Sequence, residues 1–319
     1  MIKRTVEVST SGTYIHLRQG NLVLERLGAE MASIPAEDLG LLILDYGQIT
    51  ASSAALETAV EQGAAVIFCG QDHHPAGLLL PLAGNVLHSQ RIREQVDAKL
   101  PLVKQLWRQL IKRKLQMQAA ALSKESATVD RLKRLAEEVR SGDPDNCEAQ
   151  GAKLYWSALL GSDFRRFREG APPNNLLNYG YMILRAATAR AICLAGLHPA
   201  LGLHHHNREN AFCLADDLME PFRPLVDVRV REMWHGGTTE LDRGGKHKLL
   251  SLLSDPIFLS GEQGPLMVAL QKCANSLSAC FRGEGEKLLL PDPDSLRLQA
   301  KNPPKEKPEE EDLFDGNNR

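Results

Sequence analysis

The stretch PLAGNVLHSQRIREQVDAKLPLVKQLWRQLI, residues 81–111, marks a change in the character of the sequence. It begins with Pro and Gly in PLAGN, and from residue 87 onward apolar residues recur at the spacing of an amphipathic helix. These residues are Leu100, Val103, Leu106, Trp107, Leu110 and Ile111. We therefore expect one kind of structure before this stretch and a helical one after it.

The part before it, residues 1–85, is typical of β-structure. The segments TVEVS and TYIHLRQGNLVLERL alternate apolar and polar residues, with Ser-Gly and Gly-Asn turns between them. The runs LGLLILDYG and AAVIFCG are continuously apolar, as in strands covered on both faces. Between these two runs, SSAALETAVEQG has the Ser and Gly boundaries of a short helix. Residues 1–85 are predicted to be a β-rich N-terminal domain.

The part after it is predicted to be all-helical over residues 86–285. Helical patterns continue through residues 123–140, 145–160, 175–195, 212–221, 248–253 and 262–282. The fold class is thus α+β, with a β-rich N-terminal domain followed by an all-helical C-terminal domain. Residues 286–319 end in a segment rich in Pro, Lys and Glu, so we expect a disordered tail there.

The composition is that of an ordinary globular protein, with 43% hydrophobic and 24% charged residues among 319. No apolar run is as long as a membrane span, and the N-terminus has no apolar signal-peptide core. These features predict a cytoplasmic location without a membrane partner. The six cysteines are scattered without a CxxC pair, so we expect buried thiols.

The net charge of −2 argues against strong nucleic-acid binding, but the charge is unevenly distributed. Residues 91–140 contain 13 Lys and Arg against 6 Asp and Glu. Such a block could bind phosphates and release their counterions. A solvated helix face with internal ion pairs is the alternative.

The segment GLHPALGLHHHNRENAFCLADDLMEPFRP, residues 196–224, combines histidines with carboxylates. Three consecutive histidines cannot all direct their rings to one metal in regular structure. Asp217 and Glu220 are three residues apart and share a helical face, whereas Asp216 is rotated by about 100°. One imidazole with several carboxylates favours Mg²⁺ or Mn²⁺ over structural zinc. A helix with acidic residues in its first turns explains the spacing equally well.

Two neighbouring helices carry further candidates. In DPDNCEAQGAKLYWSALLG, Glu148 lies in a first helical turn, where the helix dipole alone would favour it. Lys153 and Tyr155 follow within two turns and could contact a phosphate and a base or sugar. Arg185 and Arg190 project from the next long helix, where most arginines are solvated or ion-paired.

These segments together resemble the CRISPR-associated integrase family, Cas1, and most closely its short-tailed form that accompanies Cas9. The similarity covers LLNYGYMILRAATARAICLAGLHPALGLHHHNRENAFCLADDLMEPFRPLVD, EAQGAKLYW and the strand segments, about residues 1–285. It implies metal ligands and catalytic residues at Glu148, His205 and Glu220, with Asp217 as an additional acid and Asp216 as its alternative. It also implies a DNA path, for which the candidates are Lys153, Tyr155, Arg165, Arg166 and Arg185.

The resemblance implies an activity and partners as well. Two asymmetric homodimers bridged by a Cas2 dimer would insert a double-stranded prespacer into the CRISPR repeat, with Cas9 as a further expected partner. The reaction would be a transesterification by a DNA 3′-hydroxyl, assisted by Mg²⁺ or Mn²⁺. A stand-alone metal-dependent nuclease acting on branched or single-stranded DNA is one alternative. A non-catalytic DNA-binding scaffold, whose acids only cap a helix, is another.

Overall fold

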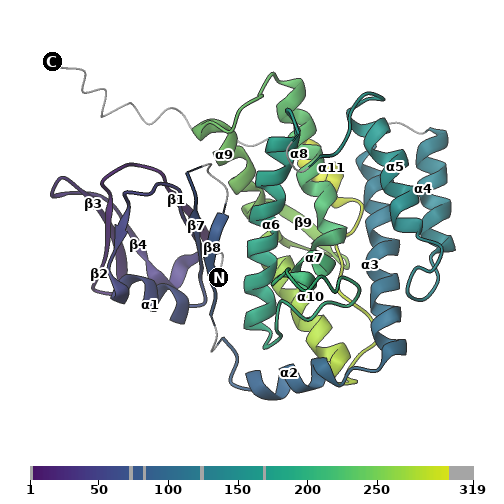
Figure 1. Ribbon diagram of the computed structural model, residues 1–319, viewed down its shortest axis with the longest axis horizontal. Helices are drawn as coiled ribbons and strands as arrows, with labels where there is room; N and C mark the ends of the chain where they lie inside the picture. The colour runs from purple at the N-terminus through teal and green to yellow at the C-terminus, as the bar shows by residue number, and fades with distance from the viewer. Residues whose placement is uncertain (1–2, 72–74, 82–83, 123–125, 168–169, 302–319) are drawn as a thin grey trace.

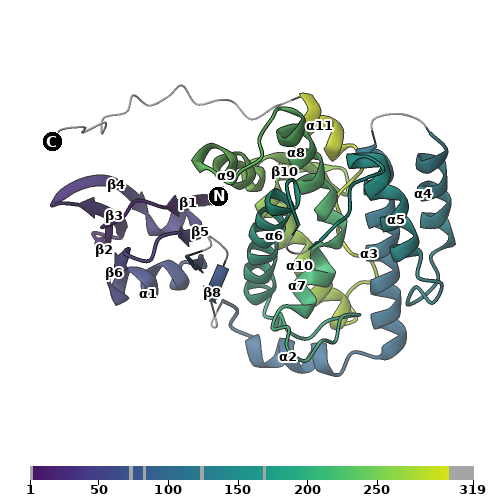
Figure 2. The same ribbon diagram turned by 45° about the horizontal axis from the view of Figure 1, so that its top comes forward.

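Strands β1–β8 gather at one end of the molecule, and helices fill most of the other end, as Figures 1 and 2 show. This computed structural model describes residues 3–71, 75–81, 84–122, 126–167 and 170–301. The expected fold class is confirmed, with a strand-rich N-terminal region followed by helices. In the described part of the chain, no helix is both long and apolar enough to cross a membrane.

The described part of the N-terminal region contains two four-stranded sheets, the helix α1 and the short 3₁₀ helix η1 (Ala36–Asp38). The first sheet has the order β1-β5-β7-β8, and the second has the order β4-β3-β2-β6. In the first sheet β1, β5 and β7 are parallel, and β8 is an antiparallel edge strand. The elements are β1 (Arg4–Val8), β2 (Tyr14–Arg18), β3 (Asn21–Arg26), β4 (Ala29–Pro35), β5 (Leu39–Leu44), β6 (Thr50–Ala51), α1 (Ser53–Glu61), β7 (Ala65–Cys69) and β8 (Pro75–Leu79).

Strand β5 belongs to two hydrophobic cores at once. All six of its residues are buried, which confirms that this apolar run is a strand covered on both faces. Leu41 and Ile43 pack into the core of the helical region. Leu42 and Leu44 point to the opposite face and join α1 and the second sheet. The first sheet is therefore the layer that joins the two halves of the molecule.

The helical region is built around two long helices, α3 (Leu100–Ala121) and α6 (Asn174–Leu194). Each begins next to a proline, and α6 is buried along most of its length. The remaining helices are α2 (His88–Val96), α4 (Ala127–Glu138), α5 (Cys147–Leu160), α7 (Cys213–Met219), the 3₁₀ turn η2 (Glu220–Phe222), α8 (Arg223–His235), α9 (Arg243–Leu250), η3 (Ser251–Ser254), α10 (Leu266–Phe281) and α11 (Ser295–Lys301).

Three features differ from the sequence-based expectation. The helical region contains a short antiparallel hairpin, β9 (Pro256–Leu259) with β10 (Glu262–Pro265). Helix α8 occupies a segment for which no element was predicted. The expected disordered tail from residue 286 is wrong for its first part, because Leu288 and Leu290 are buried and α11 follows them. Residues 302–319 of that tail lie outside the described residues.

Candidate functional site

Glu148 is placed by a tightly capped helix start. Asp143 accepts hydrogen bonds from the backbone N–H groups of Cys147 and Glu148, at 2.9 and 3.0 Å. Asn146, in a left-handed conformation, accepts from the N–H of Ala149. These acceptors satisfy the free N–H groups of the first turn of α5 and fix its direction. The carboxylate of Glu148 then points to α3, where it accepts a hydrogen bond from Lys114 at 2.7 Å.

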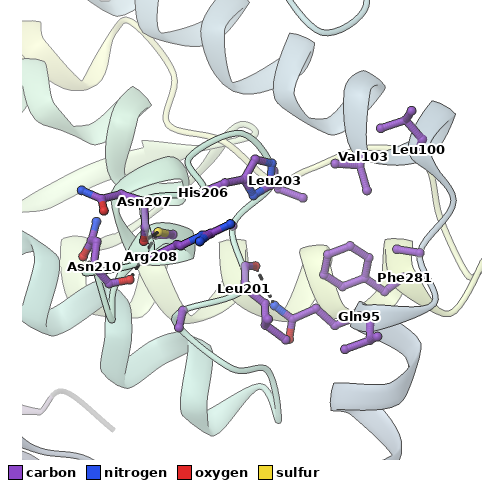
Figure 3. A pocket seen from close by; sticks show the side chains of 15 residues that line it. Gln95, Leu100, Val103, Leu201, Leu203, His206, Asn207, Arg208, Asn210 and Phe281 are labelled. Atoms are coloured by element: carbon purple, nitrogen blue, oxygen red, sulfur yellow. Dashed lines mark hydrogen bonds between the residues drawn. The ribbon is translucent and has the colours of Figure 1, made fainter.

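The loop that follows α6 carries the three histidines, and Gln95 of α2 clamps its start. The Gln95 amide donates to the carbonyls of His198 and Leu201 and accepts from the N–H of His198. Figure 3 shows the Gln95 side chain reaching Leu201 at the wall of a cavity of about 570 Å³. None of the three expected metal ligands lines this cavity. It flanks the histidine loop and is not the candidate site.

Asp217 holds the other end of this loop. It is fully buried, and its carboxylate accepts hydrogen bonds from the backbone N–H groups of Leu203, His204 and His205. Gly202 allows the close approach, since a Cβ there would lie 2.3 Å from the carbonyl oxygen of His205. The carboxylate of Asp217 thus acts as the centre around which the loop folds.

Asp217 also orients the ring of His205. The Nδ1 of His205 hydrogen-bonds with Asp217 Oδ1, which leaves Nε2 as the nitrogen available to a ligand. This hydrogen bond raises the pKa of His205, and the nearby carboxylates of Glu220 and Glu148 raise it further. The ring packs edge-on against Trp107, with the ring centroids 5.8 Å apart. His204, its neighbour, stacks flat on the same indole at 4.3 Å.

Glu220 begins η2, directly after α7, and is buried between two cations. Its Oε1 lies 3.1 Å from Arg223 Nε, and its Oε2 lies 2.6 Å from Lys114 Nζ. Burial opposes ionisation of Glu220, but Arg223 and Lys114 outweigh it and lower its pKa. Burial lowers the pKa of Lys114, but the carboxylates of Glu220 and Glu148 outweigh this effect and raise it above its ordinary value. The opposite charges of Glu220 and Lys114 therefore stabilise each other in this cluster.

The structure brings the three expected ligands, Glu148, His205 and Glu220, to one cluster from three distant parts of the sequence. Glu148 and Glu220 meet at the same lysine nitrogen, and both carboxylates lie close enough to His205 to affect its pKa. One oriented imidazole nitrogen and two carboxylates are a donor set that fits Mg²⁺ or Mn²⁺. Within the described residues, however, no three acidic, histidine or cysteine side chains are already spaced to hold a metal ion.

Asp216, the alternative acid, faces away from this cluster. Its carboxylate forms a bidentate ion pair with Arg185, at 2.6 and 2.9 Å, and accepts a hydrogen bond from Asn210. Because Asp216 and Asp217 are consecutive in a helix, their side chains differ by about 100° in direction. The structure therefore places Asp217, and not Asp216, beside His205.

The expected DNA contacts lie in different environments. Lys153 and Arg165 are exposed. Tyr155 is wrong as a DNA contact, because it is fully buried and its hydroxyl donates to Asp227 at 3.0 Å. Arg190 is also buried and donates to the carbonyl of Gly63, which excludes it from the surface.

Arg166 and Arg185 line a second cavity, of about 400 Å³, together with Arg223. Gly77 and Leu78 of β8 form its wall on the N-terminal side. Arg166 donates to the side-chain carbonyls of Asn174 and Asn178, and Arg223 lies over the ring of Tyr181. Since Arg223 also contacts Glu220, this arginine-lined cavity adjoins the candidate site.

Sequence analysis did not identify Lys114, Arg223, Trp107 or Asp227 as parts of this region. Lys114 was counted only within the basic block of residues 91–140. The neighbours Lys112 and Arg113 pair elsewhere, with Glu137 and Asp292. A run of basic residues does not reveal which one points inward, so the sequence carried no specific signal for Lys114.

Comparison with known proteins gives a consistent result. The family model "CRISPR associated protein Cas1" matches residues 6–243. A relative from Neisseria meningitidis named CRISPR-associated endonuclease Cas1 is 35% identical, with 88% of this chain and 92% of the relative covered. A Thermus thermophilus relative with a similar name is 30% identical, and the match covers 88% of this chain and 97% of the relative.

Solved structures share the fold at lower sequence identity. A casposase bound to its integration product superposes with a TM-score of 0.74 at 19% identity, covering 89% of this chain and 92% of the casposase. A Cas1 protein from Thermotoga maritima gives a TM-score of 0.70 at 18% identity, covering 90% and 99%. The family model and the two close relatives span most of the chain, and this protein therefore belongs to the Cas1 family of CRISPR-associated proteins.

Proposed function

We propose that this chain is a CRISPR adaptation integrase, which joins the 3′-hydroxyl of a prespacer to a phosphodiester at the boundary of the CRISPR repeat. The observation that carries the proposal is the convergence of Glu148, His205 and Glu220, three residues that the family resemblance singles out. Family membership and relatives named as endonucleases support DNA phosphodiester chemistry.

The proposed metal ligands are Glu148, His205 through Nε2, and Glu220. A bound Mg²⁺ or Mn²⁺ would polarise the phosphoryl oxygen and offset the charge that develops in the transition state. The chain itself prepares the donors. Asp217 fixes the tautomer and direction of His205, while Arg223 and Lys114 keep Glu220 ionised. No serine or tyrosine nucleophile is needed, because the attacking hydroxyl belongs to the DNA.

The arginine-lined cavity beside Glu220 is the proposed path of the DNA backbone. Arg166 and Arg185 are two of the expected DNA contacts, and both line it. Arg185 is partly exposed even while it pairs with Asp216, so a phosphate could share its guanidinium. Exposed Lys153 and Arg165 would contact the backbone farther from the reacting phosphate.

The proposed partners are DNA and Cas2. Solved structures of this fold include a "TtCas1-DNA complex" and a "Cas6-RT-Cas1--Cas2 complex". By analogy, two homodimers of this chain would be bridged by a Cas2 dimer and would hold a double-stranded prespacer. Association with Cas9 is part of the same proposal and rests on the family resemblance alone.

A strand-transfer assay tests the function. It combines a labelled prespacer, a repeat-bearing plasmid, Cas2 and either Mg²⁺ or Mn²⁺, and it scores the covalent junction of prespacer and plasmid. We expect Glu148→Ala, His205→Ala and Glu220→Ala each to reduce junctions to background while the dimer persists in solution. Lys272→Met, which alters an exposed ion pair with Glu262, is the control and should be as active as the unaltered protein. Full integration by any of the three alanine variants would disprove the assignment.

The stand-alone nuclease remains a second candidate, since the relatives are named endonucleases. It would use the same ligands with water as the nucleophile. The same assay separates the two functions, because a pure nuclease would cut the DNA substrates without forming any prespacer–plasmid junction.

A further inference from the structure

The ammonium group of Lys114 lies between the two carboxylates of the candidate site. Its Nζ is 2.7 Å from Glu148 Oε1 and 2.6 Å from Glu220 Oε2. Only 8% of the Lys114 residue is exposed. The three groups come from α3, α5 and η2, so three separate segments of the chain meet at this nitrogen.

These contacts give Lys114 an electrostatic task. Two carboxylates held this close repel one another unless a cation lies between them, and burial strengthens the repulsion. Arg223 neutralises part of the charge, but the contact found for it in the described residues is with Glu220 and not with Glu148. Lys114 is the group that bridges both carboxylates.

A divalent cation held by Glu148 and Glu220 would need the carboxylate oxygens that Lys114 now contacts. An ammonium and a metal ion cannot share the same space, and their charges repel. We propose that Lys114 is a built-in counter-ion of this site: it stabilises the metal-free protein, and a divalent cation must displace it in order to bind. The displacement half of this statement rests on the proposed function, whereas the stabilising half does not.

The fold offers the displaced ammonium another acceptor. Gln118 is one helical turn after Lys114 on α3, so the two side chains share a face of that helix. Its side-chain oxygen is buried and accepts no hydrogen bond from the described residues. A lysine has a flexible four-carbon stem, which allows the ammonium to turn toward such an acceptor without movement of the helix.

The first experiment measures thermal stability with and without metal in the full-length chain. Lys114→Met removes the charge and keeps most of the length of the side chain. In EDTA its Tm should be lower than that of the unaltered protein by about 5–10 °C, because the buried carboxylate of Glu220 and the partly buried carboxylate of Glu148 lose their shared partner. Saturating Mn²⁺ should restore most of this loss. The matched control is Lys112→Met on the same helix, whose exposed pair with Glu137 should leave Tm nearly unchanged with or without Mn²⁺.

The second experiment measures Mn²⁺ affinity directly by electron paramagnetic resonance of free and bound Mn²⁺. Lys114→Met should bind Mn²⁺ about tenfold more tightly or better, since the competing positive charge is gone. Lys112→Met should bind as the unaltered protein does. Equal or weaker binding by Lys114→Met would overturn the proposal, as would an unchanged Tm in EDTA.

The double variant Lys114→Met with Glu148→Gln covers the case in which the single variant does not fold. Removing one carboxylate with the lysine leaves less charge to neutralise, so the double variant should recover much of the lost Tm in EDTA. If it melts as low as the single variant, Lys114 acts by packing and the proposal fails. A protein that binds Mn²⁺ as expected but forms no DNA junctions would refute the proposed function and leave the counter-ion assignment intact.

Discussion

At the scale of single residues, Asp217 shows how one buried carboxylate can organise a site from behind the histidine loop. It is fully buried, and it accepts hydrogen bonds from three consecutive backbone N–H groups and from the ring of His205. A carboxylate can accept this many bonds because it offers lone pairs on two oxygens. The same group therefore fixes the loop and selects the nitrogen that His205 presents.

Asp217→Asn tests this role. The amide keeps the size of the side chain but places an N–H donor against the loop or the ring, so His205 loses the partner that fixes its tautomer. We expect Mn²⁺ affinity to fall about 10- to 100-fold and the pKa of His205 to fall toward its ordinary value. Manganese titration and NMR of the histidine ring measure the two effects. Asp216→Asn is the control, and equal losses in both variants would mean that Asp217 has no specific role.

The raised pKa of Asp227 leads us to expect that the free energy of unfolding depends on pH. Burial raises its pKa to about 7, although hydrogen bonds from Tyr181 and Tyr155 oppose this shift. The folded protein therefore holds the Asp227 proton more tightly than the unfolded chain, whose carboxyl titrates near 4. The free energy of unfolding should fall as pH rises from about 4 to about 7, by up to ~1.4 kcal/mol per pH unit from this group.

Urea denaturation of the unaltered protein and of Asp227→Asn, at several pH values in this window, isolates that contribution. Asparagine does not titrate, so the free energy of unfolding of the variant should change less with pH over this window. The difference between the two slopes is the contribution of Asp227. Parallel curves for the two proteins would show that Asp227 is not protonated in the folded state at mildly acidic pH.

The sequence identified some of these residues and not others, for physical reasons. Glu148, His205 and Glu220 could be named because their segments match a family pattern. Lys114 could not be named, because Lys112, Arg113 and Lys114 are three adjacent basic residues that the sequence does not distinguish. Only the packing of α3 turns Lys114 toward the site. Tyr155 is a sequence-based DNA candidate because it follows Glu148 within two helical turns, yet its hydroxyl donates to Asp227 inside the core.

At the scale of elements, helix α8 shows that the spacing of apolar residues does not predict a helix that is buried on all sides. Its segment LVDVRV alternates apolar and charged residues, which is more typical of a strand than of a helix. In the structure all six residues are buried, so there is no polar face for the pattern to reveal. The polar groups have partners inside the protein: Asp227 hydrogen-bonds with two tyrosines, and Arg229 pairs with Asp255. Strand β5 and helix α6 were predictable because their apolar patterns match their burial.

The contact between α3 and α5 sets the position of Glu148 relative to Lys114. A Cβ on Gly151 would lie 2.2 Å from a terminal methyl of Leu115, which is itself fully buried. Gly151→Ala should therefore push the two helices apart and destabilise the protein by about 1–3 kcal/mol. It should also lower strand-transfer activity, because Glu148 lies one turn away on the same helix.

Chemical denaturation and the junction assay measure these two effects. Gly285→Ala is the matched control, since a Cβ there would meet no atom within 4 Å. Combining Gly151→Ala with Leu115→Ala should cost less than the sum of the two single changes, because the smaller side chain makes room for the new methyl group. A Gly151→Ala protein as stable and as active as the unaltered one would show that the helices adjust freely.

At the scale of the whole molecule, the two halves are joined by a shared sheet and by a buried ion pair. Leu41 and Ile43 of β5 belong to the core of the helical region, so the sheet cannot separate without opening that core. Beside them, Lys246 of α9 pairs with Asp45, and Glu7 of β1 lies 4.0 Å from the same ammonium. Lys246 and Asp45 are both buried, so their charges depend on each other.

Lys246→Met should loosen this junction more than any other part of the molecule. It leaves the carboxylate of Asp45 buried without its lysine partner, which costs about 3–5 kcal/mol. Hydrogen exchange should accelerate most in β1, β5 and α9, the elements that meet at the ion pair.

The control Lys272→Met, at an exposed ion pair, should change the free energy of unfolding by less than about 1 kcal/mol. Adding Asp45→Asn to Lys246→Met should recover part of the loss, because a neutral amide is cheaper to bury than a carboxylate that has lost its lysine. If exchange instead rises evenly through the molecule and the double variant recovers nothing, Lys246 contributes through packing alone, and the shared apolar face of β5 is what holds the halves together.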